Sequence, residues 1–297
     1  MKRVNFRRLI ALLALFLMQS FVPADAAVKK NIAYGALPDE ILDMYVPDAK
    51  QHGGKPSSVM IFVHGGGWKS GDKWRVKFKP AAFNAENYIF ISINYPLLPR
   101  NPVEVQAQSV ANSVVWVEKN IKRYGGNPQQ IYLMGHSAGG HLAALIATDP
   151  AYLRVAGAGK DVLKGVVFLD SAAFNVSARM ENLEGAIGAK AYQEAFGSDP
   201  ERWKALSPVH QALQGRAIPP MLFLTASRPR QKELLANGML ERLRQLGVDY
   251  RNEMIEYSNP DNVKRNHLMI NYQVGRKGDQ VFPLMIHFID GLSAGKP

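Results

Sequence analysis

Short apolar runs alternate along the chain with longer segments in which apolar residues recur at helical spacing. The apolar runs predict buried strands at residues 59–63, 88–93, 131–134, 165–169, 221–225 and 250–256. The helical spacing predicts helices at residues 103–122, 138–148, 232–246 and 281–292. Strands and helices that alternate in this way predict an α/β fold with a mostly parallel central sheet flanked by helices.

Length and composition favour a single domain. The chain has 297 residues, of which 47% are hydrophobic, and this suffices for one large core. Residues 177–209 are richer in charge and end near a Ser-Pro pair, so we expect a small cap inserted there between two strands. The domain itself is predicted to span residues 27–297.

Residues 1–26 have the features of a secretory signal peptide. Four basic side chains precede an unbroken apolar run at residues 9–18, and Ala24 to Ala26 form an A-x-A cleavage site. The apolar run is too short for a spanning helix, which needs about 20 residues, so we expect no stable membrane anchor. These features predict a secreted or periplasmic protein.

The charge and the cysteine count narrow the function classes. The net charge is +11, and it falls to +8 without residues 1–26, which hold four basic residues and one aspartate. Lysines and arginines are scattered, so the charge favours solubility over an acidic polymer or a membrane surface, and we expect no nucleic-acid partner. The absence of cysteine excludes disulfides, cysteine nucleophiles and thiolate metal sites.

A Gly-His-Ser-Ala-Gly motif at residues 135–139 lies between a predicted strand and a predicted helix. This context is typical of a nucleophile elbow, in which small flanking residues permit the tight turn that exposes the serine, here Ser137. The alternative is an ordinary strand-turn-helix unit with a buried serine.

A second motif, His-Gly-Gly-Gly-Trp at residues 64–68, follows another predicted strand. Glycines at a strand end let backbone N–H groups turn toward a developing negative oxygen, so Gly65 and Gly66, with Ala138, are candidates for an oxyanion hole. The alternatives are a glycine turn without a ligand and an anion cradle. No nucleotide-binding glycine pattern occurs in the chain.

These motifs together resemble the α/β-hydrolase fold, and within it the HGGG carboxylesterases near the hormone-sensitive-lipase and feruloyl-esterase-like groups. Further similar segments are residues 41–47 (ILDMYVP), 93–97 (INYPL) and 124–128 (YGGNP), and the resemblance weakens after about residue 175. Pro96 stands where the family has arginine. The resemblance implies a serine hydrolase with the chain order Ser, acid, His.

His267 has the position that the family gives to the catalytic base, in a loop after the last main strand. His210 is expected to be structural or part of the cap, and His287 to be a core histidine of the last helix. The other histidines of the two motifs are expected to position the site. The role suits histidine because its pKa lies close to neutral pH.

The triad acid has two candidates. The family's usual loop corresponds to residues 226–232, which hold no carboxylate, and the nearest one beyond it, Glu233, is expected at a helix start. Asp170, at the end of the preceding predicted strand, is the alternative, because some α/β-hydrolases carry the acid one strand earlier. We favour Asp170, whose ordinary role would be that of a turn residue.

The resulting hypothesis is a secreted or periplasmic serine esterase with Ser137, His267 and Asp170 as its catalytic residues and no cofactor. Trp68 and Phe174 are expected to line an acyl pocket, which favours short or aromatic acyl esters, and the resemblance adds carbohydrate esters. Two alternatives remain: an arylformamidase-like amide hydrolase, and a catalytically silent binding protein of the cell envelope. No metal-binding motif is present, so we expect no metal.

Overall fold

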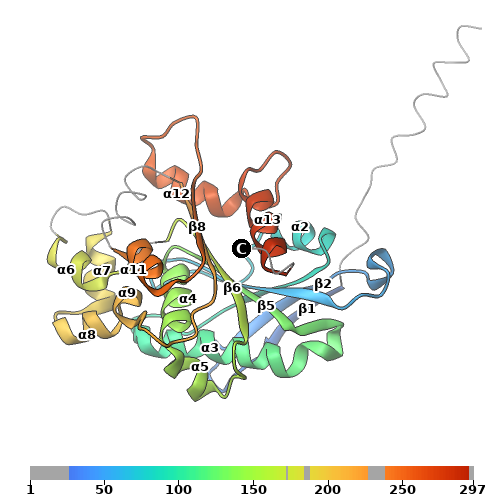
Figure 1. Ribbon diagram of the computed structural model, residues 1–297, viewed down its shortest axis with the longest axis horizontal. Coiled ribbons are helices and arrows are strands. Elements are labelled where there is room, and N and C mark those ends of the chain that lie inside the picture. The colour runs from blue at the N-terminus through green and yellow to red at the C-terminus, as the bar shows by residue number, and fades with distance from the viewer. Residues whose placement is uncertain (1–26, 172, 184–187, 227–237, 294–297) are drawn as a thin grey trace, which may run out of the picture.

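The computed structural model describes residues 27–171, 173–183, 188–226 and 238–293. These residues form an eight-stranded sheet with the order β1-β2-β4-β3-β5-β6-β7-β8. The strands β1 (Ala27–Ala33) and β2 (Ile41–Val46) run antiparallel at one edge, whereas the strands from β4 to β8 in that order run parallel to one another. The prediction of a mostly parallel sheet in an α/β-hydrolase fold is confirmed (Figure 1).

The parallel strands lie close to the predicted positions. They are β3 (Ser57–Val63), β4 (Tyr88–Ile93), β5 (Gly126–His136), β6 (Leu163–Leu169), β7 (Met221–Thr225) and β8 (Tyr250–Met254). Every residue of β4 and β7 is buried, because helices cover both faces of a parallel sheet. This burial explains why these strands appear in the sequence as continuous apolar runs.

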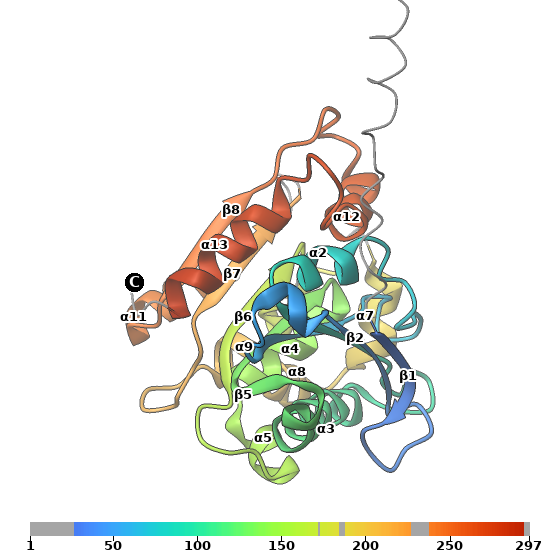
Figure 2. The ribbon, with the colours of Figure 1, turned by 90° about the vertical axis from the view of Figure 1, so that its right-hand side faces the viewer.

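Helices cover the two faces of the sheet as separate layers (Figures 1 and 2). One layer includes α3 (Val103–Asn120), α4 (Ala138–Thr148), α5 (Pro150–Ala156) and α11 (Met239–Leu246). The other includes α2 (Lys79–Ala85), α12 (Val263–Tyr272) and α13 (Val281–Ser293). Each layer has its own hydrophobic cluster, and the sheet separates the two.

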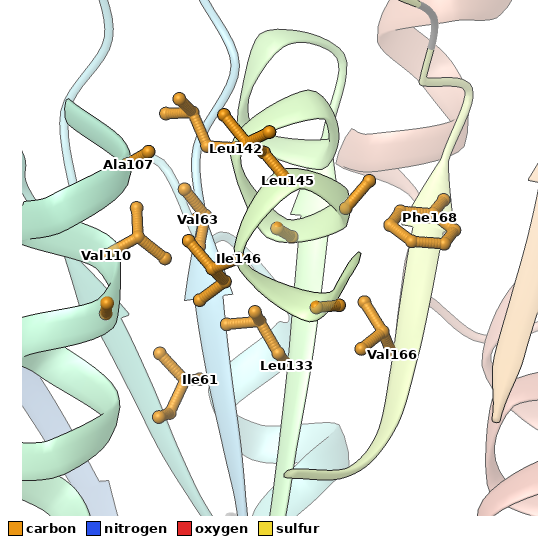
Figure 3. Close-up of a cluster of buried hydrophobic side chains, with 14 of the residues drawn as sticks. Ile61, Val63, Ala107, Val110, Leu133, Leu142, Leu145, Ile146, Val166 and Phe168 are labelled. Atoms are coloured by element: carbon orange, nitrogen blue, oxygen red, sulfur yellow. The ribbon is translucent and has the colours of Figure 1, made fainter. Parts of the chain in front are cut away.

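Strand β3 shows how one strand contributes to both clusters. Ile61 and Val63 pack with α3 and α4, whereas Met60 and Phe62 pack on the opposite face. Figure 3 shows Ile61 and Val63 facing Val110 of α3 and Ile146 of α4. Successive side chains of a strand point to opposite faces, and complete burial of each such side chain contributes about 1.5–3 kcal/mol. The strand that leads to the glycine motif is therefore rigidly held.

The predicted cap segment, residues 177–209, consists of short helices joined by turns where the structure describes it. It lies between β6 and β7 and includes α6 (Val176–Glu181), α7 (Ala189–Phe196), α8 (Pro200–Ala205) and the start of α9 (Pro208–Gln211). Its function as a cap stays a prediction.

Several expectations differ from the structure, and others concern residues outside the described ranges. The last parallel strand ends at Met254, and α12 follows where the sequence suggested a loop. Of the helix predicted at residues 232–246, the described part begins at Met239. The predicted signal peptide at residues 1–26, Glu233 and residues 227–232 lie outside the described residues. Within the described ranges, no helix is both long and apolar enough to cross a bilayer.

Candidate active site

Ser137 occupies a strained turn between two regular elements. β5 ends at His136 and α4 begins at Ala138, and Ser137 between them has φ 53° and ψ −122°. Such backbone angles are costly for a residue with a side chain and are typical of functional sites. Gly135 permits the turn, because a Cβ there would lie 2.5 Å from the Gly139 carbonyl oxygen. The elbow predicted from the sequence is thus present.

The glycine motif after β3 lies directly against this elbow. A Cβ added to Gly65 would lie 2.9 Å from the Ser137 Cβ and 2.8 Å from the His136 carbonyl oxygen. Among the described residues, the N–H groups of Gly65, Gly66 and Ala138 donate to no protein acceptor. Unused backbone donors beside a serine can stabilise an oxyanion.

Hydrogen bonds from the surrounding elements hold the glycine motif in place. The Tyr95 hydroxyl donates to the His64 carbonyl oxygen at 2.8 Å, and the Gln106 amide donates to the Trp68 carbonyl oxygen at 2.9 Å. The Trp68 indole N–H donates to His141 Nδ1 at 3.3 Å, and His141 Nε2 donates to the Leu206 carbonyl oxygen at 2.8 Å. The motif is therefore fixed to the segment after β4, to α3 and α4, and to the segment before α9.

The histidines of the two motifs are held uncharged by burial. Desolvation lowers the pKa of both His64 and His141 to about 4. Desolvation, followed by the nearby His267, lowers the pKa of His136 well below its usual value. His136 Nε2 donates to the His267 carbonyl oxygen at 2.9 Å, so this neutral ring links the end of β5 to α12.

His267 and Asp170 contact each other although 97 residues separate them. The His267 Nδ1–H donates to Asp170 Oδ2 at 2.7 Å, while Asp170 Oδ1 accepts the Ala226 backbone N–H at 2.9 Å. Asp170 follows β6 with φ 43° and is completely buried. An acceptor on Nδ1 orients the imidazole and leaves Nε2 free to take a proton.

His267 differs from its predicted setting, because it lies in helix α12 instead of a loop. The helix begins after Asn262, whose side chain caps it by accepting the Arg265 N–H at 3.1 Å. His287, expected in the core, lies on the exposed face of α13, and that expectation is wrong. His210 is exposed in α9.

Ser137 and His267 line one pocket of about 210 Å³. Its wall also includes Phe62, His64, Gly65, Gly66, Gly67, Gly71, Arg75, His136, Leu268, Asn271 and Tyr272. The pocket thus joins the nucleophile, the base and the glycine motif in one space.

Trp68 and Phe174, expected to line an acyl pocket, are not part of this wall. Trp68 is 3% exposed and packs edge-on against Tyr192 and Phe196. Phe174 is 1% exposed and packs between Phe168 and Phe223. Both side chains are core residues that support the site, because aromatic packing leaves them no free surface toward the pocket.

The sequence analysis missed one buried cation under the pocket. Lys79, in the first turn of α2, is fully buried, and its ammonium donates to the Asn271 carbonyl oxygen near the end of α12. The Lys79 ammonium nitrogen lies 4.9 Å from the centre of the Phe62 ring. Burial lowers the pKa of Lys79 to about 7. A lysine before a proline carries no sequence signal that distinguishes it from an exposed helix-start residue.

No group of three or more histidine, aspartate and glutamate side chains in the described part of the chain could hold a metal ion. The candidate catalytic groups are a serine, a histidine, an aspartate and backbone N–H donors. This set is suited to acyl transfer through a covalent intermediate.

Comparison with protein families and with characterised proteins supports this assignment. Residues 42–172 match the family model described as BD-FAE. A probable isoprenylcysteine alpha-carbonyl methylesterase of Oryza sativa is 34% identical over 125 residues, which are 42% of this chain and 29% of that protein. Esterase LipC of Mycobacterium tuberculosis is 27% identical over 232 residues, 73% of this chain and 55% of LipC.

A kynurenine formamidase of Salmo salar is 32% identical over 120 residues, which are 40% of this chain and 38% of that protein. The matches therefore span less than two thirds of the length of these relatives.

Solved structures show the same fold over nearly the whole chain. Esterase B from Lactobacillus rhamnosis superposes with a TM-score of 0.73 at 22% identity, covering 97% of this chain and 93% of that one. A truncated carbohydrate esterase from gut microbiota has a TM-score of 0.71 at 18% identity, covering 92% of this chain and 99% of that one. These superpositions show that the chain has the α/β-hydrolase fold, and residues 42–172 within it are similar to the BD-FAE family.

Proposed function

We propose that this protein hydrolyses carboxylic esters through an acyl-enzyme on Ser137. The observation that carries the proposal is the 2.7 Å bond from buried Asp170 to His267, because His267 lines the same pocket as the strained Ser137 and Gly65. A binding protein would have no physical need to keep a nucleophile, an oriented base and free backbone donors together.

The mechanism follows from these positions. His267 Nε2 takes the proton of the Ser137 hydroxyl as its oxygen attacks the ester carbonyl carbon, and Asp170 stabilises the imidazolium that forms. The N–H groups of Gly65, Gly66 and Ala138 donate to the carbonyl oxygen as it becomes negative. His267 then gives its proton to the leaving alcohol. In the second half, His267 takes a proton from the water that attacks the acyl carbon, and it gives this proton to the Ser137 oxygen as the acyl–oxygen bond breaks and the acid is released.

The substrate class is narrowed by the size of the pocket and by the relatives. A pocket of about 210 Å³ is smaller than the roughly 300–1,000 Å³ of sites for drug-sized ligands, so it favours short or compact aromatic acyl groups. The BD-FAE match and the likeness to a carbohydrate esterase support a carbohydrate ester as the natural substrate. The signal-like residues 1–26 support action outside the cytoplasm.

Ester hydrolysis across an acyl series tests the proposal. We expect wild type to hydrolyse some p-nitrophenyl esters between acetate and dodecanoate, or a feruloyl ester, and Ser137→Ala to lose at least about a thousandfold in kcat/KM. Ser198→Ala, at an exposed serine, is the matched control and should retain full activity. Equal rates for wild type and Ser137→Ala would refute the proposal.

Amide cleavage is the second candidate, because the kynurenine formamidase of Salmo salar is similar over 40% of this chain. The same triad and oxyanion donors would serve an N-formyl anilide. Comparing kcat/KM for N-formylaniline and phenyl acetate decides between the two. A folded protein that cleaves neither and resists a fluorophosphonate probe at Ser137 would favour a silent binding protein.

A further inference from the structure

The pocket beside Ser137 has an uneven distribution of charge. Arg75 is the only lysine, arginine, aspartate or glutamate in the wall of this pocket as drawn from the described residues. The histidines that share the wall at the base of the pocket, His64 and His136, are uncharged at neutral pH because burial lowers their pKa values. The guanidinium therefore supplies a positive charge that no carboxylate of the wall offsets.

Arg75 is also without an ion-pair partner in the part of the chain that the structure describes. The nearest acidic residue in sequence is Asp72. Its two side-chain oxygens accept hydrogen bonds from the Trp74 N–H at 3.1 Å and the Asn94 amide at 3.4 Å. Lys73 differs in this respect, since it pairs with Asp43 at 3.2 Å. No carboxylate of the described residues therefore neutralises the charge of Arg75.

The position of the guanidinium is supported by an aromatic ring. The Arg75 guanidinium carbon lies 5.2 Å from the centre of the Trp74 ring, which is 64% exposed. A cation–π contact of this kind restrains the guanidinium plane while its N–H donors stay available at the edge. Leu268, which is 41% exposed, adds an apolar surface to the same wall.

We propose that Arg75 makes this site selective for esters that carry a carboxylate group in addition to the scissile ester. A guanidinium presents parallel N–H donors that match the two oxygens of a carboxylate, and a single unpaired cation balances a single negative charge. This inference rests on the proposed esterase function and adds to it the chemical class of the substrate.

Paired substrates test the inference. One pair places the charge on the alcohol side, with 4-acetoxybenzoate against 4-acetoxybenzamide. The other places it on the acyl side, with the mono-4-nitrophenyl ester of adipic acid against 4-nitrophenyl hexanoate. We expect kcat/KM for the anionic member to exceed that of the neutral member by roughly 10- to 100-fold in at least one pair, as for hydrogen bonds to charged groups.

The Arg75→Gln variant should abolish this preference, so that the anionic and neutral members of a pair have kcat/KM values within about twofold of each other. Arg75→Lys should retain part of the preference, because it keeps the charge and loses the planar fork. Arg100→Gln is the matched control, at an exposed arginine outside the pocket wall, and should behave as wild type. The preference should also weaken between 50 mM and 500 mM salt.

The inference would be overturned by no anionic preference in wild type, by an unchanged preference in Arg75→Gln, or by an equal loss for neutral and anionic esters. A preference for 4-acetoxyphenyl phosphate alone would replace the carboxylate with a phosphate and also overturn it. If wild type cleaves no ester, the proposed function fails separately. Calorimetric binding of 4-acetoxybenzoate and its amide to Ser137→Ala, with and without Arg75→Gln, then tests the anion preference without turnover.

Discussion

An aspartate lies at each end of strand β6, and the two aspartates have different surroundings. Asp161 precedes the strand and Asp170 follows it, and both have a positive φ, of 53° and 43°. Asp161 is exposed and lines a hollow of about 620 Å³, whereas Asp170 is buried and contacts His267 beside a pocket of about 210 Å³. The larger hollow is therefore not the pocket that contains Ser137 and His267.

The difference follows from the direction of the sheet. The carboxyl ends of β3, β5 and β6 lie next to one another, so the glycine motif, Ser137 and Asp170 all emerge at one edge. In open α/β sheets, sites form at this edge because the loops that leave parallel strands converge there. The larger hollow, at the opposite ends of the strands, has apolar walls and exposed Lys160 but no oriented base.

The largest expected effect concerns the two aspartates. Asp170→Asn should lower kcat about ten-thousandfold, because an amide cannot stabilise the imidazolium and favours the wrong tautomer of His267. Asp161→Asn should leave kcat unchanged. Steady-state ester hydrolysis of both variants measures this, and a fully active Asp170→Asn enzyme would assign the acid to another residue.

A matched pair of glycines gives the next largest effect. Gly65→Ala places a methyl group 2.9 Å from the Ser137 Cβ and should lower kcat about 10²- to 10³-fold by displacing the oxyanion donors. Gly159→Ala, at the larger hollow, would meet only the end of the Glu118 side chain and should retain wild-type kcat. Equal activity of the two variants would contradict the assignment of the oxyanion hole.

The buried histidines of the active-site end predict a loss of stability in acid. The pKa of His141 in the folded protein is about 4, below that of the unfolded chain, so protons bind preferentially to the unfolded state between pH 6.5 and 4. The free energy of unfolding should therefore decrease as the pH is lowered from 6.5 to 4, by up to about 1.4 kcal/mol per pH unit from this group. His64, with the same pKa, adds a similar loss.

Urea unfolding at pH 7.5, 6 and 5 measures this dependence. His141→Gln should make the dependence less steep without abolishing it, because the variant has no group to protonate at that position whereas His64 is still present. His287→Gln, at an exposed histidine of α13, serves as the control and should keep the wild-type slope. The same slope in all three proteins would show that His141 is not held uncharged.

The smallest effect is expected from filling the larger hollow. Ala158→Trp should occupy part of its volume and leave kcat/KM for a short ester within about twofold of wild type, because surface changes far from a site rarely alter it. Ester hydrolysis checks this. A loss of tenfold or more would mean that the larger hollow takes part in substrate binding.

Burial explains which elements were predicted correctly from the sequence and which were missed. Strands such as β4 and β7 were predicted at the correct residues because burial on both faces leaves a continuous apolar run. Helix α12 was missed because its polar residues obscure the helical spacing, and His267 was consequently assigned to a loop. His287 was assigned to the core because it lies within an apolar run, yet it faces solvent on α13.

The sequence by itself determined the fold class, the elbow at Ser137 and the glycine motif, because each depends on residues that are neighbours in the chain. Only the tertiary structure decided the partners that are distant in sequence. It brought His267 to Asp170, packed Trp68 and Phe174 into the core, and left Arg75 as the only permanent charge among the described residues of the pocket wall. Such contacts depend on how helices pack on the sheet, and no local pattern specifies that packing.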